Sequence, residues 1–159
     1  MDIKKFKMMV IAITLIGSFL VFGGGIKKAH ADYYMSEVAY YCAYAGFYEG
    51  LGEYFSGYSI YYDIPSYQYD AYYSYLAAMN SAYNAALNAT SSTDLLWYDA
   101  YDYAYTAYQL FDTAAYYAYN AAYYGSLSDA GFAQMTAGVG CYYLAQATFI
   151  AGYIEPYLY

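Results

Sequence analysis

Residues 95–124 read LLWYDAYDYAYTAYQLFDTAAYYAYNAAYY, and they carry most of the information about the fold. Polar side chains recur along them at steps of three and four residues, as Asp99, Asp102, Thr106, Gln109, Thr113, Tyr116 and Asn120. The opposite face would be apolar throughout, with Trp97, Tyr101, Ala104, Tyr108, Phe111, Ala115, Ala118 and Ala122. This spacing predicts an amphipathic helix that packs against other helices.

Local signals predict where this helix begins and ends. Ser91 and Asp94 have the spacing of a capping box, with Asp in place of the usual Glu, so we expect the helix to begin after Asp94. Gly125 is a C-terminal stop after Tyr124. The same Ser-to-Asp spacing recurs directly afterwards, in Ser126-Leu127-Ser128-Asp129. A further helix is therefore predicted from this cap to about Ile154, before Glu155-Pro156.

Two more helices are predicted upstream. The first begins at Ser36, an N-cap with Glu37 in the first turn, and runs to about Phe55, with Gly57 as its end. The second runs from Pro65 to about Asn88. Its polar stripe would be Asp70, Ser74, Ala77, Ser81, Asn84 and Asn88. Its core face would be Tyr72, Leu76, Met79, Tyr83 and Ala86.

Four such helices predict an all-α domain of residues 32–159 that resembles a four-helix bundle. The 159 residues include 31 Tyr, and large Tyr side chains can pack against Ala across a helix seam. A β-rich chain is the alternative, because tyrosines also alternate, as at Tyr101, Tyr103 and Tyr105.

The N-terminus reads as a cleaved secretory signal, residues 1–31. Lys4, Lys5 and Lys7 precede the apolar run 8–22, which is short for a membrane span. Ala29 and Ala31 flank His30 in the small-x-small pattern of a cleavage site before Asp32. We therefore expect a secreted, periplasmic or cell-surface protein. An uncleaved anchor is the alternative, because Lys27 and Lys28 follow the apolar run.

Residues 32–159 contain no Lys, Arg or His and keep 12 of the 13 acidic residues, so their side-chain charge is −12. A nucleic-acid partner is excluded by the missing basic residues, and anionic lipid is disfavoured. Catalytic groups that titrate near neutral pH are also missing, so we expect neither an enzyme nor a cofactor or metal. Because all charges repel, acid should stabilise the compact state.

The two cysteines, Cys42 and Cys141, lie near opposite ends of this acidic domain. An exported protein meets an oxidising compartment, and an even number of cysteines predicts one disulfide between them. Two free, buried thiols are the alternative.

Residues 130–154 contain no charge. Their length would admit a membrane span, but Gln and Thr side chains lower the hydrophobicity and no basic residue flanks the segment. The preferred interpretations are a central helix of the bundle or a buried contact between subunits. A membrane-embedded subunit is the weaker alternative.

The tyrosines are too many for one core, so many should lie at the surface as contact residues. Tyr98, Tyr101, Tyr105 and Tyr108 form the candidate contact stripe. The sequence favours an exported structural or self-assembling protein of a cell surface, matrix or filament. A small extracellular module that binds carbohydrate, peptide or aromatic ligands is the alternative.

Overall fold

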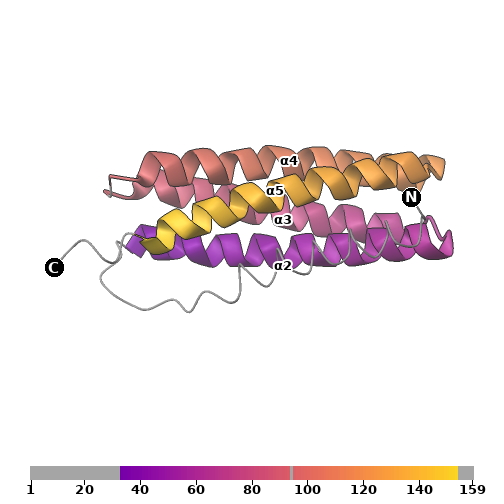
Figure 1. Ribbon diagram of the computed structural model, residues 1–159, viewed down its shortest axis with the longest axis horizontal. Coiled ribbons are helices and arrows are strands. Elements are labelled where there is room, and N and C mark those ends of the chain that lie inside the picture. The colour runs from indigo at the N-terminus through magenta and orange to yellow at the C-terminus, as the bar shows by residue number, and fades with distance from the viewer. Residues whose placement is uncertain (1–32, 94, 154–159) are drawn as a thin grey trace, which may run out of the picture.

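The computed structural model describes residues 33–93 and 95–153, which form four long helices joined by short connections. The helices are α2 (Tyr33–Tyr62), α3 (Tyr67–Ser91), α4 (Trp97–Tyr124) and α5 (Leu127–Tyr153). They lie side by side and alternate in direction (Figure 1). The predicted all-helical bundle is confirmed, and the β-rich alternative is wrong for the described part of the chain. The predicted signal peptide, with Ala29 and Ala31, lies outside the described residues.

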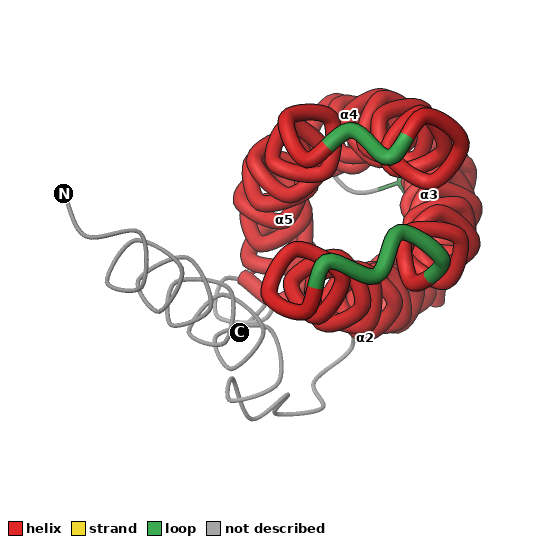
Figure 2. The backbone as a smooth tube through the Cα atoms, turned by 90° about the vertical axis from the view of Figure 1, so that its right-hand side faces the viewer, coloured by secondary structure: helices red, strands yellow, loops and turns green. Residues whose placement is uncertain are grey.

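The helices form a ring in chain order, with α5 closing against α2 (Figure 2). Each helix packs against its two neighbours, and the diagonal pairs have few contacts. None of the described helices takes the centre, so of the two preferred interpretations of residues 130–154 the central helix is wrong, and the contact between subunits stays a prediction. Between Tyr33 and Tyr153, no described helix is long and apolar enough to cross a membrane.

The ends of α4 and α5 follow their predicted signals. Gly125 adopts the left-handed conformation, with φ of 66°, directly after the last residue of α4. The Ser126 hydroxyl then accepts a hydrogen bond from the backbone N–H of Asp129 at 3.2 Å. The stop signal and the cap are therefore both confirmed.

Four other predicted helix ends are wrong. α2 continues through Gly57 to Tyr62, where Asp63 turns the chain with φ of 56° and the Ile64 N–H bonds to the Ser59 carbonyl at 3.1 Å. Ser36 lies inside α2 rather than at its cap, and its hydroxyl donates to the Tyr33 carbonyl. α3 extends through Ser91, and α4 begins only at Trp97.

The core consists mostly of alanine, which lets neighbouring helices approach closely. Its large members are few: Met35, Val38, Tyr75, Phe111 and Leu144. The two aromatic rings each lie on a glycine of the next helix. A Cβ at Gly52 would lie 2.6 Å from Tyr75 Cδ1, and a Cβ at Gly140 would lie 2.9 Å from Phe111 Cε1.

Candidate functional site

The outer surface of the bundle is rich in tyrosine. Among the tyrosine side chains that the structure describes, only Tyr75 is buried. Sixteen are exposed: Tyr33, Tyr34, Tyr40, Tyr44, Tyr54, Tyr61, Tyr62, Tyr69, Tyr73, Tyr83, Tyr98, Tyr116, Tyr119, Tyr123, Tyr124 and Tyr142. The others whose side chains are described are partly buried, and most of them pack against the core. Alanine thus fills the inside, and phenol groups cover much of the outside.

The predicted contact stripe is one row of this surface. Along α4 the ring centroids of Tyr98 and Tyr101 are 6.5 Å apart, those of Tyr101 and Tyr105 5.5 Å, and those of Tyr105 and Tyr108 5.4 Å. Tyr98 is 61% exposed, whereas the other three are partly buried and pack against the core. Tyr108 also contacts Tyr83 of α3 at 5.4 Å. The stripe therefore has one exposed ring, at Tyr98, and three rings that pack at the edge of the core.

Further rows, which the sequence analysis did not single out, lie on the other helices. On α2, Tyr54, Tyr58 and Tyr62 contact one another in succession, with centroids 6.1 Å and 4.3 Å apart. Tyr119 of α4 contacts Tyr72 of α3 at 5.6 Å. The signal was present in the sequence, because side chains four residues apart are neighbours on a helix.

Two carboxyl groups lie in the interior of the bundle. Glu49 is fully buried, and Glu53, one turn further along α2, is 7% exposed. The Tyr75 hydroxyl donates to Glu53 Oε1 at 3.4 Å, whereas neither carboxyl oxygen of Glu49 has a hydrogen-bond partner. The thiol of Cys141 on α5 lies beside Glu49. No basic residue is available among residues 32–159 to pair with either carboxyl group.

Burial raises the pKa of both carboxyl groups. Loss of water raises the pKa of Glu49 from 4.5 to about 8. Burial, and secondly the neighbouring Glu49, raise the pKa of Glu53 well above its ordinary value. This pair was not predicted from the sequence, where every acidic residue was counted as one of the mutually repelling charges. The signal was the seven-residue spacing Met35, Cys42, Glu49 and Ser56, which places Glu49 on the core face, with Glu53 one helical turn further on.

The predicted disulfide between Cys42 and Cys141 is not present in the structure, where both are free, buried thiols. Across the α2/α5 seam, Cys42 faces Thr148, whereas Cys141 faces Glu49. The two cysteines thus lie seven residues apart in register, about 10 Å along the helix axis. A disulfide needs Cα atoms within about 7 Å. Burial raises the pKa of Cys42 to about 12 and raises that of Cys141 as well, so both stay protonated.

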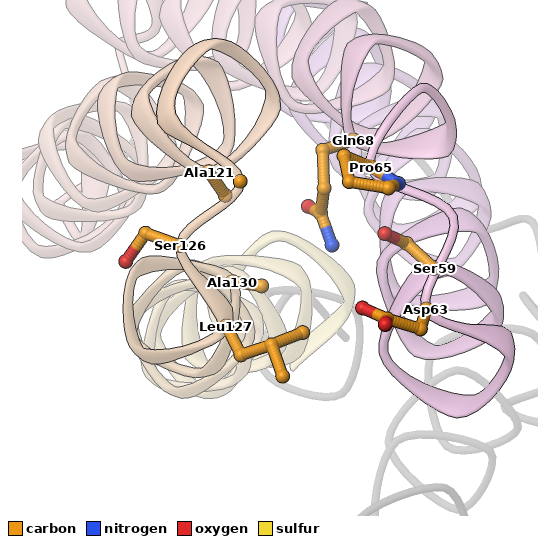
Figure 3. Close-up of a pocket in the computed structure, with 9 residues that line it drawn as sticks. Ser59, Asp63, Pro65, Gln68, Ala121, Ser126, Leu127 and Ala130 are labelled. Carbon is orange, nitrogen blue, oxygen red and sulfur yellow. The ribbon is translucent and has the colours of Figure 1, made fainter.

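A small pocket lies at the end of the bundle where the α2/α3 and α4/α5 connections meet. Ser59, Asp63, Ala121 and Leu127 help to line it, and the amide of Gln68 reaches into it from α3 (Figure 3). It offers about 10 Å³ for the centre of a water molecule, roughly what one water requires. This pocket is too small for a ligand, and residues 33–93 and 95–153 contain no cluster suited to a metal ion.

Comparison of the chain with known protein families, with curated proteins and with solved structures finds no match. The function must therefore be argued from the tyrosine surface and the buried acids themselves.

Proposed function

We propose that this chain is an exported structural protein that associates with copies of itself through its outer aromatic surface. One observation carries the proposal: the large side chains are outside and the small ones inside. An ordinary soluble domain hides most of its aromatic area, whereas here sixteen of the described tyrosines are exposed. Tyrosine suits this role because it buries a large area and keeps a polar tip.

The alternative, a module that binds carbohydrate, peptide or aromatic ligands, has less support. Ligand sites are usually concave and hold several hundred cubic ångströms. The pocket beside Gln68 holds about one water molecule. The aromatic rows are spread around the helices instead of converging on one cleft. A surface of this kind suits broad contact better than selection of one small molecule.

Sedimentation velocity of the exported chain, measured from micromolar to millimolar concentration, tests the proposal. We expect species larger than the monomer, with a population that grows with concentration. Binding of the same chain to an array of immobilised glycans is measured in parallel. A chain that remains monomeric throughout and binds one glycan class would favour the alternative function.

A further inference from the structure

The outer face of α5 carries a second apolar stripe. Large side chains recur on it at steps of three and four residues, as Phe132, Met135, Val139, Tyr142 and Phe149, and they are between 49% and 66% exposed. The opposite face of the same helix buries Ala133, Ala137 and Leu144 in the core. α5 therefore has a second face with helix-packing periodicity, at one end of which Phe132 contacts Tyr117 of α4 with ring centroids 5.5 Å apart.

A row of small residues runs beside this stripe. Gly131, Gly138, Ala145 and Gly152 follow one another every seven residues. A Cβ added at any of these three glycines would meet nothing within 4 Å. The glycines are therefore not required by packing inside the bundle, unlike Gly140. The large side chains form a ridge, and the small residues form a groove beside it. Two helices pack together when the ridge of one fits into the groove of the other.

Charge indicates which occupant suits this face. Residues 130–153 carry no charge, whereas the other helices carry exposed or partly exposed acids, such as Glu37, Asp70 and Asp102. Where exposed acids of two copies face one another, their carboxylates come together without a basic residue to neutralise them. At the outer face of α5 two copies can meet without this repulsion.

We propose that the outer face of α5 binds the same face of a second copy, antiparallel, with the two-fold axis near Val139. Such an isologous contact lets the large row of each copy fill the small row of the other. The five large side chains have surface areas of about 150–250 Å² each, and about half of each is exposed. They would bury roughly 500 Å² of accessible surface per copy, or about 1,000 Å² in the dimer. This total is near the lower limit for a specific protein–protein interface. The inference rests on the proposed self-association and identifies the surface through which two copies would associate.

Charge variants at Val139 test the contact. Two copies of V139E would place like charges face to face at the axis, so we expect the dissociation constant of the dimer to rise about tenfold or more. V139K should weaken association likewise, and an equimolar mixture of V139E and V139K should restore it. The matched control is L87E, because Leu87 on α3 is 45% exposed, close to the 49% of Val139. Circular dichroism verifies that each variant is folded.

A cysteine variant provides a second test that adds no charge. Near a two-fold axis, V139C should form an intermolecular disulfide under mild oxidation, whereas L87C should not. The native thiols do not compete, because Cys42 and Cys141 are buried.

The outcomes separate this inference from the proposed function. Association that V139E leaves unchanged, or that L87E weakens equally, would overturn the α5 contact while self-association stands. A wild-type chain that stays monomeric would overturn both. Sedimentation of such a monomer with phosphatidylcholine vesicles, abolished by V139E, would assign the face to lipid instead.

Discussion

Two glycines determine where the two fully buried aromatic rings of the described core can lie. Tyr75 of α3 lies on Gly52 of α2, and Phe111 of α4 lies on Gly140 of α5. Gly140 is also close to the backbone-proximal part of α4, because its Cβ would lie 3.3 Å from Leu110 Cβ. Each ring thus occupies the space that a side chain would need. Glycine is otherwise unfavourable inside a helix, so packing is the reason for these two.

Alanine at either position should destabilise the fold. We expect Gly52→Ala and Gly140→Ala each to lower the free energy of unfolding by about 1–3 kcal/mol, because the overpacking outweighs the better helix propensity of alanine. Gly57→Ala is the control: its Cβ would meet only the amide nitrogen of Gln134, at 3.4 Å. That variant should gain about 0.5–1 kcal/mol. Denaturant unfolding measures all three, and equal effects would contradict the assigned packing.

Helix number and several helix ends could be predicted because local chemistry specifies them. Gly125 and Ser126 act within one turn of chain, and both signals operate as expected. Gly57 misled the prediction because glycine ends a helix only when the chain needs a left-handed residue. Here Asp63 provides that residue six positions later. Packing of α2 against its neighbours carries the helix through the glycine.

The helix faces were harder to predict than the helices. The expected core face of α3 included Tyr72, Leu76 and Tyr83. The buried face instead contains Ala71, Ala78 and Ala82. Each of these positions is one residue earlier in the chain or close to it, so the buried face is rotated by about 100° about the helix axis from the expected one. The physical reason is that periodicity identifies apolar positions without ranking them. Alanine permits close helix approach, whereas tyrosine can keep its hydroxyl in water from the edge of a seam. In a chain rich in both, the small residues take the inside.

Rings at the edge of a seam should still stabilise it. Tyr83 of α3 and Tyr108 of α4 are in contact, with centroids 5.4 Å apart and planes inclined by 47°. A double-mutant cycle with Tyr83→Ala and Tyr108→Ala should show a coupling free energy of about 0.5–1.5 kcal/mol. The pair Tyr83→Ala and Tyr116→Ala supplies the control, since no contact joins those rings in the described structure. Coupling of similar size in both cycles would mean that the contact contributes nothing specific.

The buried acids make the stability of the whole bundle depend on pH. In the unfolded chain Glu49 and Glu53 lose their protons near pH 4.5, whereas the folded chain holds the proton on Glu49 up to about pH 8. Between these values folding retains protons that the unfolded state has lost, so stability falls as pH rises. The slope should approach about 1.4 kcal/mol per pH unit for each retained proton. Thermal unfolding between about pH 4 and pH 8 measures it.

The sequence alone predicted that stability depends on pH because all the carboxylates repel one another. The variant Glu49→Gln/Glu53→Gln separates the contribution of the two buried acids from this general repulsion. The amides are neutral at every pH, so the variant should show a much flatter pH profile and greater stability at neutral pH. A profile as steep as that of the wild type would assign the dependence to the surface acids. A wild-type melting temperature that drops on acidification would contradict both explanations.

The order of helices around the ring has a kinetic consequence. Three of its four seams join helices that follow one another in the chain, and such local pairings form quickly because little loop entropy is lost. The α2/α5 seam joins residues as distant as Cys42 and Thr148, and its interface is smaller than the other three. Polar contacts cross it, including the bond from Gln134 Nε2 to the Glu53 carbonyl. We expect this seam to form last during folding, and the ring to open there first.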